Sequence, residues 1–141
     1  MDSHAVIVSL LPEEGKEMLE EEMLAKKIWA VVGANTDPKK YGNMIYRKLK
    51  LRGYEVYAIN PGYEIVDGDK CYKNLTSLPK QPEVVNMVIS PKRGVPVLEE
   101  AASLGIEYIW FQPGTYNDDL LEFAGKLGLK AVQACALVAT R

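Results

Sequence analysis

The sequence predicts an α/β fold built on a doubly wound sheet of five parallel strands, with an extra helix at the N-terminus. The first observation is the alternation, from residue 28 onward, of short apolar runs with segments of helical periodicity. Strands that alternate with helices are joined by right-handed crossovers, which gives a parallel sheet covered on both faces. The second observation is size, because 141 residues, 48% of them hydrophobic, suffice for one domain with its own core.

The chain ahead of the sheet contains a helix over about residues 12–27. This segment opens with a proline and several acids and ends in two lysines, as suits the two ends of a helix. An apolar stripe along it would cover a face or an edge of the sheet: Met18, Leu19 and Met23. We therefore expect two parts, an N-terminal extension over 1–27 and a domain over 28–141.

The first two strands flank one helix. The run IWAVVG at 28–33 is an uninterrupted apolar strand that ends in a glycine, and YEVYAI at 54–59 is the second strand. The loop ANTDPKKYG leads from the first strand to a helix near 42–52. Its apolar residues recur every four positions, and Gly53 suits its C-terminal end.

Three further strands follow. VVNMVIS at 84–90 is the third, IEYIWFQ at 106–112 is the fourth, and LKAVQA at 129–134 is the fifth. A helix over about 95–104 joins the third strand to the fourth, with Pro96 in its first turn. The helix before the fifth strand has a clear start, an N-cap asparagine followed by two aspartates: Asn117, Asp118 and Asp119.

The segment 60–83 interrupts this alternation. It is polar and rich in turn residues, so it predicts an extended loop with one helical turn near 75–78 rather than a crossover helix. The five strands are then expected in the order 3-2-1-4-5, with the first strand central and residues 28–32 buried.

Composition and charge exclude several classes of protein. The net charge is −2, the isoelectric point is about 5.5, and no nucleic-acid-binding module is recognisable, so we expect no nucleic acid partner. No apolar run approaches the roughly 18 residues of a membrane helix, and the N-terminus lacks the basic start of a secretory signal, so we expect no membrane partner. Cys71 and Cys135 lie far apart and outside any metal-binding motif, which argues against zinc and disulfides and favours the cytoplasm.

Ligands of an open parallel sheet bind beyond the carboxyl ends of the strands, where the strand order reverses. Four segments of this sequence are expected to meet there. They are Gly33, Ala34 and Asn35 through Lys39, Lys40 and Tyr41; Asn60, Pro61 and Gly62; Ser90, Pro91 and Lys92; and Gln112, Pro113 and Gly114. Tyr41 and Tyr63 are aromatic residues that could flank a flat base.

The loop after the first strand has the features of a diphosphate site. Gly33 would let the backbone approach an anion, the next helix would offer free N–H groups, and Lys39 and Lys40 would supply countercharge. A run of bases without any acid also favours a phosphate-bearing partner: Lys39, Lys40, Arg47, Lys48, Lys50 and Arg52. Two plainer interpretations stay open, namely that Gly33 only makes a tight turn and that the later bases only form a solvated helix face.

Common nucleotide-binding motifs are absent. Gly33 and Gly42 are too far apart for GxGxxG, and the second strand ends in Ile59-Asn60-Pro61, without the acid that holds the ribose of NAD. GxxxxGK[ST] does not occur either. NAD and a P-loop nucleotide are therefore disfavoured.

Candidates for catalysis are few. His4 is the only histidine, so a Ser/His or Cys/His nucleophile is not expected. Cys135 lies in an apolar setting typical of a core residue, and Cys71 has no base nearby in sequence. No pair of carboxylates calls for acid–base chemistry. We expect no catalytic residue and no metal.

Several segments together resemble a known family. AVVGANTDPKKYG, YEVYAINPGYE, GDKCYKNL and WFQPGTYNDDLLEFAGKLGLK, with a cysteine at the last strand, resemble the small stand-alone CoA-binding proteins of bacteria and archaea. These proteins are similar to the CoA-binding domain of the succinyl-CoA synthetase alpha subunit. The resemblance covers about residues 28–137 and implies a Rossmann-like domain.

The resemblance also implies a binding mode. The loop Gly33–Tyr41 would wrap the CoA phosphates, Asn60-Pro61-Gly62 would lie against the adenosine, and Ser90-Pro91 with Phe111-Gln112-Pro113 would line the pantetheine path. The synthetases have a lysine after strand two that contacts CoA, and here Tyr63 stands in its place. Their phosphohistidine belongs to a later domain that this chain is expected to lack.

The sequence thus predicts non-catalytic binding of CoA or acyl-CoA, by a carrier, a sensor or a regulatory subunit. One alternative is an NADP- or NAD-binding reductase-like protein, in which Lys39 and Lys40 would serve a 2′-phosphate. Another is a scaffold subunit that docks on a CoA-using enzyme through its acidic N-terminal helix. Whether the chain forms a homo-oligomer or joins a CoA-dependent enzyme stays open.

Overall fold

The computed structural model describes residues 13–141, so that His4 and Pro12 lie outside the described residues. The elements in chain order are α1 (Glu13–Leu24), β1 (Ile28–Val32), α2 (Tyr41–Leu51), β2 (Glu55–Ile59), β3 (Ile65–Val66), β4 (Asp69–Tyr72), β5 (Val84–Met87), α3 (Pro91–Ser103), β6 (Tyr108–Phe111), α4 (Asp118–Lys126), β7 (Lys130–Gln133) and α5 (Ala136–Ala139).

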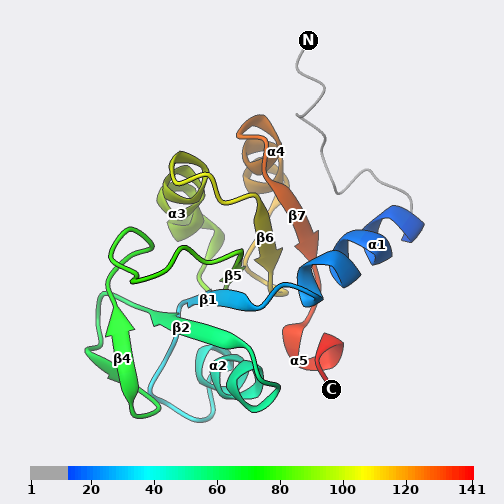
Figure 1. The fold of residues 1–141 in the computed structure, drawn as a ribbon. Helices are drawn as coiled ribbons and strands as arrows, with labels where there is room; N and C mark the ends of the chain where they lie inside the picture. The colour runs from blue at the N-terminus through cyan, green and yellow to red at the C-terminus, as the bar shows by residue number, and fades with distance from the viewer. Residues whose placement is uncertain (1–12) are drawn as a thin grey trace.

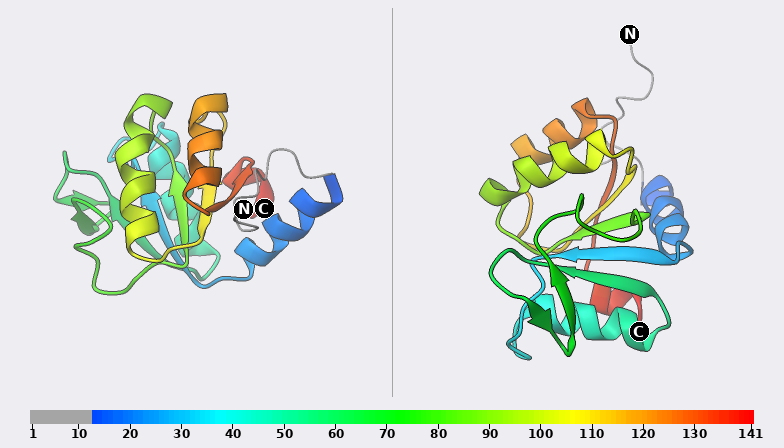
Figure 2. Two further views of the ribbon diagram at one scale, coloured as in Figure 1. Left: turned by 90° about the horizontal axis from the view of Figure 1, so that it is seen from above. Right: turned by 60° about the vertical axis from the view of Figure 1, so that its left-hand side comes forward.

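One sheet organises the molecule (Figure 1). Its strand order is β3-β4-β2-β1-β5-β6-β7, and every pair is parallel except the β3–β4 hairpin. Figure 2 shows α3 and α4 side by side on one face and α2 with α5 on the other. Each face has its own cluster of buried apolar side chains, which confirms the doubly wound α/β class.

β1 is central, as the sequence predicts, but only β2 is a neighbour in its predicted place, and Ile28 is half-buried rather than buried. β1 pairs with β2 on one side and with β5 on the other. Trp29, Ala30 and Val31 are completely buried because helices cover both faces of this strand. An uninterrupted apolar run is typical of such a strand.

The number and order of the strands differ from the prediction. The sheet has seven strands, and the place beside β2 is taken by β4 rather than by the third predicted strand. That predicted strand, β5, lies on the other side of β1 instead. The sequence DKCY of β4 has only Cys71 fully buried, so no apolar run marked it as a strand.

The segment 60–83 is therefore more structured than a loop. β3 and β4 form a hairpin whose turn contains Asp67 and Gly68, both with positive φ. The predicted turn near 75–78 is present, since the Leu78 N–H donates to the carbonyl of Leu75 at 3.2 Å.

α3 begins earlier than the sequence predicts. Pro91 is its first residue, where a proline fits because the N–H would be unpaired, and Pro96 lies inside the helix. The prediction placed Pro96 in the first turn because prolines are rare further in. Asn117, in contrast, caps α4 as predicted and accepts a hydrogen bond from the Leu120 N–H at 2.8 Å.

α1 lies at the β7 end of the sheet (Figure 1). Leu19 and Met23 are buried in the cluster that contains Trp29, whereas Met18 is 70% exposed, so only part of the predicted stripe packs. The Tyr54 hydroxyl donates to the carbonyl of Leu24 at 2.6 Å. No helix over residues 13–141 is both long enough and apolar enough to cross a bilayer.

Candidate functional site

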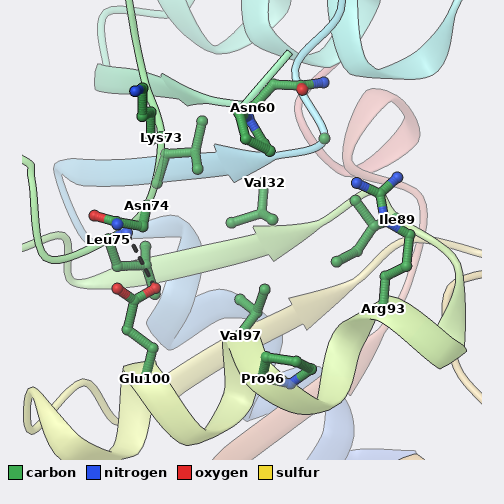
Figure 3. Close-up of a pocket in the computed structure, with 13 residues that line it drawn as sticks. Val32, Asn60, Lys73, Asn74, Leu75, Ile89, Arg93, Pro96, Val97 and Glu100 are labelled. Atoms are coloured by element: carbon green, nitrogen blue, oxygen red, sulfur yellow. Dashed lines mark hydrogen bonds between the residues drawn. The ribbon is translucent and has the colours of Figure 1, made fainter.

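A pocket of about 360 Å³ opens at the carboxyl ends of β1 and β2, beside α3 (Figure 3). The chain leaves β1 for α2 on one face of the sheet and leaves β5 for α3 on the other. The pocket therefore lies at the point where the connections switch faces. Open α/β sheets bind their ligands at this place.

The interior of the pocket is apolar. Val32 and Ile59 come from the ends of β1 and β2, and Leu75, Ile89 and Val97 close the sides. Val32 and Ile89 are far apart in sequence, and they meet because β5 lies beside β1. Such walls suit a flat, hydrophobic ring system.

Two cations stand on opposite sides of this interior. Figure 3 shows Lys73 and Arg93 at its rim with Val32 between them. Neither makes an ion pair within residues 13–141. Both are exposed, so both can meet an anionic group of a ligand.

Glu100 fastens one wall of the pocket. Its carboxylate accepts hydrogen bonds from the N–H groups of Leu75 and Thr76, each at 3.1 Å, and from the Thr76 hydroxyl at 2.7 Å. The carboxylate is thereby engaged inside the protein. Its contacts hold the 75–78 turn against α3.

Position 33 requires a glycine because the backbone at the end of β1 passes close to the backbone that follows β5. Its φ is 100°, and a Cβ there would lie 2.4 Å from the carbonyl oxygen of Val88. The N–H groups of Gly33 and Ala34 both donate to the carbonyl of Ile59, at 2.9 and 3.2 Å. These two donors, which the sequence assigned to a diphosphate, are therefore engaged within the protein. Gly33 still lines the pocket.

The rest of this loop is folded onto the start of α2. Asn35 accepts a hydrogen bond from the Asp37 N–H at 2.8 Å, and its carbonyl accepts one from Asn43 at 2.9 Å. Lys40 is the N-cap of α2 and its side chain makes no capping hydrogen bond, which leaves first-turn N–H groups open to a ligand. Lys39, Lys40 and Tyr41 are exposed outside the pocket wall.

The loop after β2 connects the pocket to a second hollow. Asn60 donates to the carbonyl of Ala34 at 2.8 Å and accepts from the Gly62 N–H at 2.8 Å, which joins the two loops. Beyond it lies an open groove of about 950 Å³ between Gly62, Tyr63 and the β3–β4 hairpin. Pro61, Lys73 and Asn74 line both the pocket and the groove.

Some predicted site residues lie elsewhere. Phe111 is completely buried in the core, and Gln112 is 3% exposed, with its amide bonded to the Ala136 N–H and to the Cys135 sulfur. Ser90, Pro91 and Lys92 form the start of α3, and Pro113 is exposed in the loop after β6. None of these six lines the pocket or the groove.

The sequence did not indicate the other wall of the pocket. Lys73, Asn74 and Leu75 belong to the segment taken for a polar loop, and Arg93 and Glu100 belong to α3. A lysine and an arginine in polar stretches look like ordinary surface residues. The pairing of β4 with β2 brings Lys73, Asn74 and Leu75 to the site, and the position of β5 beside β1 brings Arg93 and Glu100.

The thiol that lines the groove, Cys71, is a weak nucleophile. Cys71 is 6% exposed, and burial raises the pKa of its thiol. Its sulfur lies 3.5 Å from the carbonyl oxygen of Asn60. Residues 13–141 contain no group of three or more His, Cys, Asp or Glu side chains able to hold a metal ion.

A known protein family matches this chain. The profile of a family described as "CoA binding domain" matches residues 27–141. Among characterised proteins, an ADP-forming acetate–CoA ligase I of Archaeoglobus fulgidus is 27% identical over 122 residues, which are 79% of this chain and 18% of the ligase. The alpha subunit of the ADP-forming acetate–CoA ligase II of Pyrococcus furiosus is 28% identical over 114 residues, covering 73% of this chain and 25% of the subunit. The chain thus spans a quarter or less of these relatives.

A solved structure covers almost the whole chain. A hypothetical protein from Pyrococcus horikoshii OT3 is 34% identical and superimposes with a TM-score of 0.82, over 92% of this chain and 93% of that protein. The likeness therefore extends to a protein of nearly the same length.

Proposed function

Since the chain belongs to the family of CoA binding domains, we propose that it binds coenzyme A or acyl-CoA at the pocket between β1, β2 and α3, without catalysis of its own. The observation that carries the proposal is the apolar pocket with unpaired cations at the switch point of the sheet. Its volume of about 360 Å³ suits the nucleotide end of CoA better than the whole molecule.

The adenine ring is assigned to the apolar interior. Val32 and Ile59 offer one flat surface, and Val97 and Leu75 bound the opposite side. Burial of an aromatic ring between such side chains supplies affinity without a specific hydrogen bond.

The diphosphate is assigned to the side where Arg93 lies. Arg93 is in the first turn of α3, whose N-cap Ser90 makes no side-chain cap, and α2 begins nearby without a cap either. Open N–H groups, two helix dipoles and a guanidinium all favour a phosphate. Lys39 and Lys40 remain candidates for a second, solvated contact with it, and Tyr41 and Tyr63 for stacking.

The absence of catalysis is supported by two observations. The matched segment is a quarter or less of the ligase chains, so the likeness to it does not carry the ligase reaction over to this protein. The thiol of Cys71, which lines the groove, is kept protonated by burial and is a poor nucleophile in that form. We propose a carrier, sensor or regulatory subunit, with 28–141 as its binding domain.

The proposal also covers which forms of CoA bind, in which compartment the protein works and with which partner it associates. CoA and acyl-CoA share the nucleotide end, so this pocket would take both. Cys71 and Cys135 are both free, in keeping with the reducing cytoplasm expected from the sequence. Either a homo-oligomer or an association with a CoA-using enzyme is consistent with this assignment.

A pair of tryptophan variants tests the site. Val97→Trp places an indole inside the pocket, whereas Val95→Trp places it on the same helix at a position already 40% exposed. Isothermal titration should show CoA binding to the wild type and to Val95→Trp within about twofold of each other, and none to Val97→Trp. NAD and NADP should bind the wild type more weakly than CoA.

Two results would contradict the proposal. One is tighter binding of NAD or NADP than of CoA, which would favour the reductase-like alternative. The other is unchanged CoA binding by a folded Val97→Trp protein, as judged by circular dichroism.

A further inference from the structure

The pocket and the groove meet at one basic side chain. Pro61, Lys73 and Asn74 line both hollows, and Lys73 is the only one of the three that carries a charge. In Figure 3 its side chain lies on the far side of the pocket from Arg93. A ligand that fills the pocket and continues into the groove passes Lys73.

The neighbouring cations are already engaged. Lys70 lies over the ring of Tyr72 at 5.0 Å, Lys50 pairs with Asp67 and Asp69, and Lys80 pairs with Glu55. Over residues 13–141 Lys73 has neither an ion pair nor a ring contact. The one acid in the pocket lining, Glu100, is bonded to the 75–78 turn, and the one acid in the groove lining, Glu64, makes no ion pair within residues 13–141.

The chemistry of the ligand fits this arrangement. CoA carries a diphosphate on the 5′ side of its ribose and a separate phosphate on the 3′ oxygen. With the adenine in the pocket and the diphosphate towards Arg93, the ribose lies along Asn60 and Pro61. Its 3′ oxygen then faces the groove rather than the apolar interior.

Resting on the function proposed above, we propose that Lys73 binds the 3′-phosphate of CoA and makes the site selective for it over adenine nucleotides that lack this phosphate. Two features define the subsite, an exposed cation that has no ion pair within residues 13–141 and a groove wide enough to keep the phosphate hydrated. An exposed charge-assisted contact of this kind gives moderate, salt-dependent selectivity.

Titration with two ligands and three proteins tests the assignment. The ligands are CoA and dephospho-CoA, which differ only in the 3′-phosphate. The proteins are the wild type, Lys73→Gln and, as a matched control from the same groove, Lys70→Gln. A Lys73→Arg variant tests whether any cation suffices.

The wild type should prefer CoA by about tenfold, and Lys73→Gln should lose that preference while binding dephospho-CoA within about twofold of the wild type. Lys70→Gln and Lys73→Arg should keep it. The preference should also shrink as the salt concentration rises.

The failures are distinguishable. If the wild type binds neither ligand, the proposed function and this inference both fall. If it binds both ligands equally, or if Lys73→Gln weakens both by the same factor, CoA binding stands and the role of Lys73 is overturned. Loss of the preference in Lys70→Gln alone would move the subsite to Lys70.

Discussion

At the scale of single residues, one carboxylate holds a wall of the pocket against α3. Glu100 joins α3 to the 75–78 turn through three hydrogen bonds, and Leu75 in that turn is 3% exposed. Without the carboxylate, two N–H groups and a hydroxyl lose their acceptor. The wall that carries Lys73 and Asn74 then loses its link to the helix.

Glu100→Ala should therefore lower the free energy of unfolding by about 1–3 kcal/mol, since hydrogen bonds to charged groups are worth that much. Hydrogen exchange of the Leu75 and Thr76 amides should accelerate, and CoA should bind more weakly. Urea denaturation, exchange measurements and titration check the three effects.

Glu99→Ala is the matched control, because Glu99 is exposed on the same helix. Equal effects of the two substitutions would show that helix propensity, rather than the contact with the turn, is responsible.

At the scale of elements, the β3–β4 hairpin is anchored to α2 by a small polar network. Lys50 pairs with Asp67 at 2.9 Å and with Asp69 at 2.5 Å, and the Tyr46 hydroxyl donates to Asp69 at 2.8 Å. The Lys50 hydrogen bond is the main cause that lowers the pKa of Asp69, and the Tyr46 hydroxyl lowers it further. The hairpin borders the groove, so this network also positions Lys70, which lies on β4.

The lowered pKa of Asp69 gives the stability a definite pH dependence. A carboxyl with a folded pKa below its usual 3.8 stabilises the protein above that pH and ceases to do so as the pH falls through the folded value. Asp69→Asn should lower the melting temperature at pH 7, and the difference from the wild type should shrink as the pH falls below the usual 3.8 and through the lowered folded pKa of Asp69. Thermal melts at several pH values measure it.

Glu122→Gln serves as the control for this experiment, because Glu122 makes an exposed pair with Lys126 at 3.5 Å on α4. Its melting temperature should change little at any pH. A difference for Asp69→Asn that persists undiminished into acid would contradict the electrostatic origin.

The same scale shows why the sequence predicted some elements and not others. Strands that are covered on both faces, such as β1, appear as unbroken apolar runs. β4 is at the margin of the sheet with one fully buried residue, so its sequence looks like a loop. The start of α3 at Pro91 was missed because Pro96, which lies inside the helix, was taken for a residue of its first turn.

The part of the candidate site that could be predicted was the part that depends on β1 and β2 alone. Gly33, Asn60 and Pro61 could be named because β1 and β2 end in glycine and in NPG. The α3 wall, with Arg93 and Glu100, depends on β5 crossing to the far side of β1. No local pattern in the sequence carries that information.

At the scale of the whole molecule, the isolated protein should bind CoA esters without turning them over. Incubation with acetyl-CoA, followed by a thiol assay, should give a rate at the uncatalysed background. The reason is that Cys71 is the one thiol among the described residues that line the pocket or the groove, and burial raises its pKa.

Cys71→Ser and Cys135→Ser variants complete this test. A rate well above background that one of them abolishes would identify a catalytic thiol. Such a result would overturn the non-catalytic part of the proposal.

All residues that line the pocket and the groove lie between Val32 and Glu100. The forty-one residues that follow build β6, α4, β7 and α5, which complete the sheet and cover it (Figure 1). No residue after Glu100 lines either hollow, whereas residues between Val32 and Glu100 serve both the ligand site and the core, as Val32, Ile59 and Leu75 do. The exposed surface of α4 is free to drift, or to acquire a partner, without disturbing the residues that recognise the ligand.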